Sequence, residues 1–142
     1  MTLADAELAA SLRVAVMRLR RRLASEHDPA HALSIGAMAV LGALLREGEL
    51  TVGALAERER VRPPSMTRTV GHLVEGGYVT RMSSPEDRRQ VVVQATERGR
   101  AAVLADRRRR EAWLAERLRE LSAQEREVLR AAAPLLDRLA HA

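Results

Sequence analysis

Apolar residues recur at spacings of three and four in the first part of the chain, which predicts an amphipathic helix over residues 5–24. This helix should end at His27-Asp28-Pro29, because the residue before a proline avoids the helical region. Residues 35–46 are apolar nearly all round and follow Ser34, a suitable N-cap, so we expect a second, buried helix. Gly48 should end it.

Two short helices are predicted in the middle of the chain. Thr51 can cap the first, over residues 52–58, and a turn at residues 59–62 follows. Pro63-Pro64 should open the second helix, which continues over residues 65–75. Proline suits a first turn because the amide that it lacks would be unpaired there in any case.

A β-hairpin should come next. Gly76-Gly77 can end the preceding helix, since glycine readily takes the left-handed conformation at a helix C-terminus. Residues 78–82 and 90–95 are rich in β-branched side chains and predict two strands, joined by a loop at residues 83–89. Leu50 is expected to be an extended link only.

Two further helices complete the pattern. One should cover residues 96–119, and the last should begin at a capping box formed by Ser122 and Glu125. Pro134 should remove a backbone hydrogen bond from this last helix and kink it. The first helix and these two carry apolar stripes that a small hairpin-bearing domain cannot cover, so we expect a second copy of the chain to bury them.

The order of these elements predicts a mainly α fold with a small β-hairpin wing, the winged helix-turn-helix. We expect one domain over residues 1–142. Its DNA-binding region should cover residues 34–100, and residues 1–30 and 101–142 should form a helical dimerisation region. A dimer of such readers matches the two-fold symmetry of a palindromic site, with half-sites ~34–36 Å apart.

The charge distribution agrees with a nucleic-acid partner. The chain has 142 residues and a net charge of +5, and all 24 of its basic residues are arginine. Arginine grips phosphate or guanine with a planar fork, although codon usage alone also explains the lack of lysine. Residues 51–100 hold nine arginines and six acidic residues, so the excess of positive charge is concentrated in the predicted DNA-binding region.

Other classes of function find little support. There is no cysteine, which excludes disulfides and a thiol switch. We find neither a signal-peptide pattern nor an apolar run of ~20 residues, and therefore expect a cytoplasmic protein with no membrane partner. No catalytic motif, phosphate loop or carboxylate pair is present, so we predict no enzyme activity and no cofactor.

The motifs of the middle region resemble those of the MarR family of bacterial transcription regulators. The resemblance covers nearly the whole chain and is carried by Leu55-Ala56, Ser65-Met66-Thr67-Arg68 through Leu73, Gly77-Tyr78-Val79-Thr80-Arg81, Asp87-Arg88-Arg89, and Ala95-Thr96 with Gly99. The family more often has leucine at the position of Ala95. The resemblance implies a homodimer that binds operator DNA, usually to repress. It also implies frequent release of the DNA by a small phenolic or lipophilic compound.

Three neighbouring residues of the hairpin loop are candidate wing residues. Arg89 is expected to enter the minor groove, where the phosphates focus negative potential. Asp87 should act within the protein, as a carboxylate that pairs with a nearby arginine and stiffens the hairpin. Arg88 is either that partner or a contact to a DNA phosphate, and the sequence does not separate the two.

The helix over residues 65–75 should read the major groove. Its buried face is expected at Met66, Val70 and Leu73, which are spaced by four and three. The candidate DNA-contacting residues are Ser65, Thr67, Arg68, Thr69 and His72. Arg68 can bind guanine bidentately or contact a phosphate, and these alternatives weigh equally. Ser65 and Thr67 can hydrogen-bond phosphate together with backbone amides.

Several conspicuous features have simpler explanations. Arg107 to Arg110 point all round a helix and cannot form one flat patch, so a solvated or salt-bridging stretch is expected. His27 and His31 have the spacing of metal ligands, but Pro29 lies between them and we predict no metal. Trp113 either packs at the dimer interface, which we prefer, or lines a ligand cavity.

We therefore expect a homodimeric winged-helix regulator that binds a pseudo-palindromic duplex and represses by occupying a promoter. Two alternatives remain open. The winged domain could be a protein-interaction module that no longer reads DNA, or the protein could coat DNA with little sequence specificity.

Overall fold

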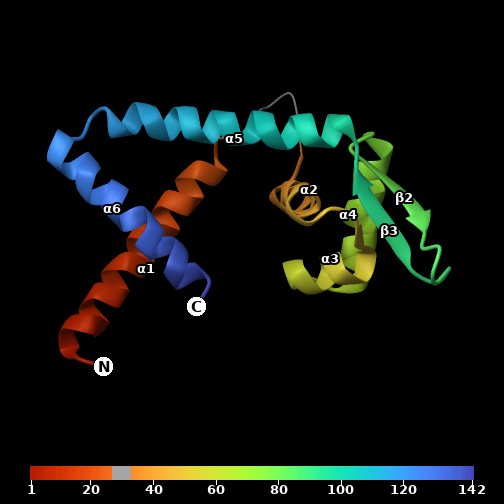
Figure 1. The fold of residues 1–142 in the computed structure, drawn as a ribbon, viewed down its shortest axis with the longest axis horizontal. Coiled ribbons are helices and arrows are strands. Elements are labelled where there is room, and N and C mark those ends of the chain that lie inside the picture. Colours follow the sequence, from red (N-terminus) through yellow and green to blue (C-terminus); the bar gives the residue numbers. More distant parts are fainter. Residues whose placement is uncertain (27–32) are drawn as a thin grey trace. The chain divides into compact units, whose positions relative to one another are not determined.

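The computed structural model describes residues 1–26 and 33–142 of the chain. Six helices and three short strands lie in the described part (Figure 1). Their order is α1 Leu3–Ala24, α2 Ile35–Glu47, β1 Leu50–Thr51, α3 Val52–Glu59, α4 Pro63–Glu75, β2 Val79–Ser83, β3 Val91–Ala95, α5 Glu97–Leu118 and α6 Ala123–Ala140. The predicted class, mainly helical with a small hairpin, is confirmed.

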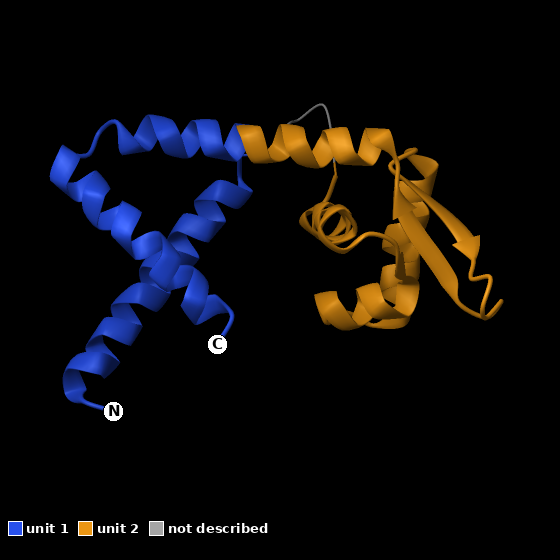
Figure 2. Cartoon of the chain, viewed as in Figure 1, with its two compact units in different colours: residues 1–26, 109–142 blue, residues 27–108 orange. Residues whose placement is uncertain are grey.

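The chain divides into two compact units (Figure 2). Unit 1 consists of residues 1–26 and 109–142, and unit 2 of residues 27–108. Helix α5 contributes to both, since its residues up to Arg108 belong to unit 2 and the rest to unit 1. The boundary between the two units therefore falls inside a helix.

The core of unit 2 is built around α2. Its residues Val40 and Leu41 are completely buried, as are Leu55 from α3, Leu73 from α4 and Val93 from β3. The prediction that this helix is buried is correct for its middle, residues 37–45, whereas both ends are exposed, including Ile35 at 66%. Ser34 caps the helix as expected, accepting the backbone N–H of Ala37 at 3.0 Å.

The sheet has one strand more than predicted. Leu50 and Thr51 pair with Val93 and Val92, so the stretch expected to be only an extended link is the edge strand β1. The strand order is β1-β3-β2, and both pairings are antiparallel. Because β3 is the central strand, Val93 is covered by neighbours and fully buried.

The junction of the hairpin with α5 is tightly packed. Gly77 has a φ of +77°, the left-handed conformation predicted for this glycine pair, whereas Gly76 is right-handed. Thr96 Oγ1 donates a 2.7 Å hydrogen bond to the carbonyl of Gly77 and accepts the N–H of Gly99. A Cβ atom at Gly99 would lie 2.2 Å from the carbonyl oxygen of Tyr78, so only glycine fits there. These contacts hold the base of the hairpin.

Helices α1 and α6 of unit 1 both begin at a capping box. The capping box at Ser122 and Glu125 is confirmed, and Thr2 and Asp5 form a second one. The hydroxyl and backbone N–H of Thr2 bind the Asp5 carboxylate and hold its pKa below the ordinary 3.8. Helix α6 contains Pro134 and runs on to Ala140.

Trp113 of α5 is half-buried and lies beneath two guanidinium groups of unit 1. Those of Arg22 and Arg117 lie 4.5 Å and 5.7 Å from the centre of its ring. This stacking supports a packing role for the indole. Among the helices that the structure describes, none is long and apolar enough to cross a membrane.

Candidate nucleic-acid interface

Helix α4 has one buried and one exposed face. Met66, Val70 and Leu73 are buried at 2% exposure or less, as their spacing predicts. Ser65, Thr67, Arg68 and His72 are exposed, whereas Thr69 is only half-exposed. The expectation that Thr69 points outward is therefore correct only in part, because its side chain lies at the margin of the two faces.

Two threonine hydroxyls of α4 are occupied within the helix. Thr67 Oγ1 donates to the carbonyl of Pro63 at 3.0 Å, and Thr69 Oγ1 donates to the carbonyl of Ser65 at 3.1 Å. A hydroxyl has one proton, so these oxygens can still accept a hydrogen bond but cannot also donate one. In this arrangement they suit a base amino group better than a phosphate, and sequence alone could not show this.

In the first turn of α4, Ser65 carries the hydrogen-bond donors that remain free. Pro63 and Pro64 have no backbone N–H, and the N–H of Met66 is bonded to the carbonyl of Arg62 at 3.1 Å. No side chain caps this helix. The backbone N–H and the hydroxyl of Ser65 are therefore the groups of the first turn best able to meet a phosphate.

The hairpin loop is organised by Asp87. Its Oδ1 atom accepts the backbone N–H of Arg89 at 3.0 Å, and its carbonyl accepts the N–H of Gln90 at 3.0 Å. The loop closes where the N–H of Ser84 donates to the carbonyl of Gln90 at 2.8 Å. The Asp87 side chain thus forms a hydrogen bond within the loop. Its partner, however, is a backbone amide, and Asp87 forms no ion pair in the described part of the chain.

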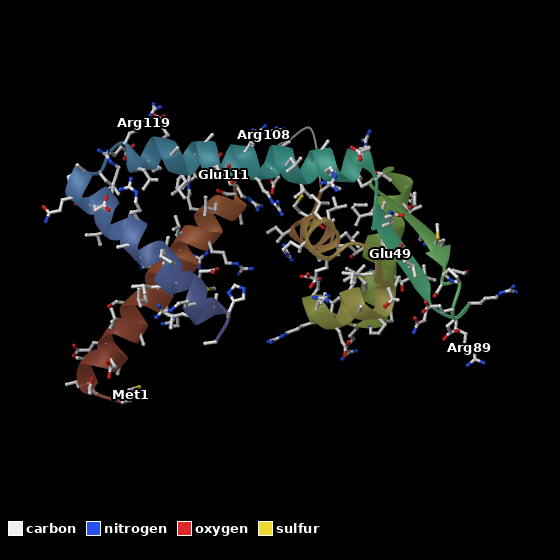
Figure 3. The ribbon with its side chains drawn as sticks, viewed as in Figure 1. Met1, Glu49, Arg89, Arg108, Glu111 and Arg119 are labelled. Atoms are coloured by element: carbon white, nitrogen blue, oxygen red, sulfur yellow. The ribbon has the colours of Figure 1, made fainter. Side chains whose placement is uncertain are left out.

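Arg88 and Arg89 are exposed at the free end of the hairpin, where Figure 3 labels Arg89. Neither of them, nor Arg68 on α4, forms an ion pair within the described residues. Arg60, Arg62 and Arg81 of unit 2 likewise form no ion pair within the described residues, whereas Arg58 pairs with Glu47. The guanidinium groups of Arg68, Arg88 and Arg89 keep their full charge available to an anionic partner.

A hollow of about 450 Å³ lies between α4 and the hairpin, within unit 2. It is lined by residues of β1, the start of α3, α4, the two hairpin strands and the hairpin loop: Thr51, Val52, Gly53, Thr67, Val70, Arg81, Arg89, Gln90 and Val91. It brings together two predicted site residues, Thr67 and Arg89. Arg81 was not predicted as a site residue, because its place beside α4 depends on the pairing of β2 with β3.

Comparison with known proteins agrees with this geometry. The sequence pattern that defines the MarR family matches residues 33–90. An HTH-type transcriptional regulator of Mycobacterium bovis is 49% identical over 132 residues, a match that covers 93% of this chain and 92% of that protein.

The chain belongs to the MarR family.

Solved structures extend the agreement to the complete MarR fold. A transcriptional regulator protein of Pseudomonas aeruginosa superposes with a TM-score of 0.85 and 36% sequence identity, covering 99% of this chain and 98% of that one. A MarR family protein of Bacillus stearothermophilus has a TM-score of 0.80 at 24% identity and covers 98% and 96%. This chain is therefore a DNA-binding transcriptional regulator with a winged helix-turn-helix.

The remaining sequence candidates of this MarR protein lie outside α4 and the hairpin. Arg107 and Arg108 are exposed on the part of α5 that belongs to unit 2. His27 and His31 lie outside the described residues. In the part that is described, no three histidine, aspartate or glutamate side chains gather closely enough to hold a metal ion.

Proposed function

We propose that this MarR family regulator binds a pseudo-palindromic operator as a homodimer and represses transcription from the promoter that it covers. Helix α4 would enter the major groove and the hairpin the neighbouring minor groove. The observation that carries the proposal is the shared hollow of α4 and the hairpin, flanked by arginines without intramolecular ion pairs.

The exposed face of α4 supplies the proposed base contacts. Ser65, Arg68 and His72 follow one another at spacings of three and four, so they share one side of the helix. His72 lies beside Glu75, with 3.8 Å between Nδ1 and Oε2, and both side chains are solvent-accessible. A guanidinium on this face can bind O6 and N7 of guanine.

The hairpin supplies the proposed minor-groove contact. The Asp87 side chain holds the backbone of Arg89, which leaves the guanidinium free beyond the turn. An arginine inserted into a narrow minor groove is stabilised by the concentrated negative potential of the phosphates. Arg88 would contact the sugar-phosphate backbone nearby.

The apolar surface of unit 1 supports the homodimer. Neither α1 nor α6 has a single buried residue within the described chain. Large apolar side chains are exposed along both, including Leu8 and Val16 on α1 and Leu135 and Leu139 on α6. Exposed apolar area of this extent is typical of a subunit interface. Release of the operator by a small-molecule effector is supported by the family resemblance.

Binding of the purified protein to duplexes from its own upstream region tests the proposal. We expect footprints with two-fold symmetry, and an affinity that falls steeply with salt as counterions are released. Arg89→Ala should weaken binding roughly ten-fold or more, which is about 1.4 kcal/mol. Arg119→Ala is the matched control, since it removes the same charge from an exposed position of unit 1.

The outcome also separates the alternative functions. Equal affinity for the operator and for a scrambled duplex would indicate a DNA-coating protein. No binding to any duplex would favour a protein-interaction module. A screen for compounds that release the bound operator then tests the proposed effector.

A further inference from the structure

Gly71 lies in the middle of α4, between the predicted contact residues Thr67, Arg68 and His72. A Cβ atom built on Gly71 would have no atom of the described chain within 4 Å. Its backbone is that of an ordinary right-handed helix, without a positive φ. Alanine would therefore fit this position without displacing any described neighbour.

Glycine is a poor choice for such a position. In a helix interior it is less favourable than every other residue except proline, because it loses the most backbone freedom on folding. Gly36 and Gly53 lie in the first turns of α2 and α3, outside the helix interior, and Gly42 is buried within α2. Three further glycines of unit 2 have evident structural reasons. Gly76 and Gly99 lie against Tyr78, and Gly77 has a positive φ. Within the described structure Gly71 has no comparable reason, so a contact outside the chain is the natural explanation.

The position of Gly71 indicates what that contact is. Gly71 follows Thr67 by one turn and Arg68 by three residues, so it lies among the side chains proposed to meet DNA. The Thr67 hydroxyl donates to the carbonyl of Pro63 and so lies against the helix, which makes this side of α4 project less. A glycine lets a ligand approach the backbone more closely than any side chain would allow.

We propose that duplex DNA packs directly against the α4 backbone at Gly71, and that this glycine sets how deeply the helix enters the major groove. The inference rests on the proposed function and adds a DNA-contacting residue to it. The contact is steric, because Gly71 contributes no charge and no side-chain hydrogen bond. Its loss should therefore be visible in affinity and leave the salt dependence unchanged.

Substitution by alanine and by leucine tests the proposal. Both residues favour helix, so Gly71→Ala should raise Tm by about 2–4 °C, and Gly71→Leu should not lower it. The operator Kd should rise roughly five-fold or more for alanine and further for leucine, with the slope of log K against log salt unchanged. A stabilised protein that binds less well is the distinguishing result.

Gly36→Ala is the matched control. Gly36 lies in the first turn of α2, is exposed, and a Cβ atom there would meet only Ser34 Oγ, at 3.9 Å. This variant should keep the wild-type Kd. Size-exclusion chromatography of all three variants reports whether the oligomeric state has changed.

The outcomes are distinct. Wild-type affinity in Gly71→Ala would overturn the inference and leave the proposed function standing, provided that the wild-type protein binds its operator. A fall in Tm would show that the fold requires the glycine, and a change to monomer would place Gly71 at a subunit contact; either result overturns the inference. A wild-type protein that binds no duplex would defeat the inference and the proposed function together.

Discussion

The carboxylate of Asp87 accepts the backbone N–H of Arg89 at 3.0 Å, across the turn of the hairpin. This contact places a negative side chain next to the arginine proposed to enter the minor groove. The carboxylate is engaged by the backbone, so it orders the turn without neutralising the guanidinium in an ion pair. Asp87 is thus expected to position the hairpin loop for DNA.

Asp87→Ala should lower operator affinity by a factor of about 2–10. This factor corresponds to the loss of one hydrogen bond that contributes about 0.5–1.5 kcal/mol. Asp87→Asn should restore most of the loss, because its side-chain oxygen can accept the same N–H. Fluorescence anisotropy with a labelled operator measures both. Tighter binding by Asp87→Ala would instead mean that the carboxylate acts chiefly by repelling phosphate.

We predict that Arg68, which lies on the exposed face of α4 and forms no ion pair in the described chain, binds a base and not only a phosphate. Arg68→Lys keeps the charge but loses the planar fork. We therefore expect both Arg68→Lys and Arg68→Ala to lose ~1–3 kcal/mol of binding free energy for the operator. Both variants should discriminate less between operator and point-mutated duplexes. Near-wild-type affinity of the lysine variant would assign Arg68 to a phosphate.

Arg60 ends α3 in the left-handed conformation, with φ 52° and ψ 44°. The turn requires it, since the N–H of Val61 reaches the carbonyl of Ala56 at 3.0 Å. A residue with a side chain is strained there, so Arg60→Gly should stabilise the fold by roughly 0.5–1 kcal/mol. Arg60→Ala removes the same charge without relieving the backbone and should bring no gain. Thermal unfolding of the two variants makes the comparison.

Leu139 is 65% exposed on α6, a helix without buried residues. If α6 packs against a second chain, Leu139→Glu should shift the protein toward monomer while leaving its helical content intact. Val61→Glu is the control, because Val61 is a partly exposed apolar residue of unit 2. Sedimentation and circular dichroism report the two properties. A Leu139→Glu protein that sediments like the wild type would place the subunit interface elsewhere.

Local sequence determined the helices and the buried face of α4. Met66, Val70 and Leu73 recur with the period of a helix, so any fold that uses this helix must bury them together. The capping box at Ser122 and the left-handed Gly77 also follow from residues a few positions apart. Such features depend only on neighbouring residues, and a single sequence therefore reveals them.

Tertiary structure alone decided the pairing of Leu50 with Val93, the half-burial of Thr69 and the place of Arg81 beside the hollow. Each depends on residues that are distant in the chain and meet only after folding. A two-residue strand has too little pattern of its own to be recognised. A hydroxyl likewise has several possible partners until the chain has folded, and that of Thr96 donates to the carbonyl of Gly77, 19 residues earlier in the chain.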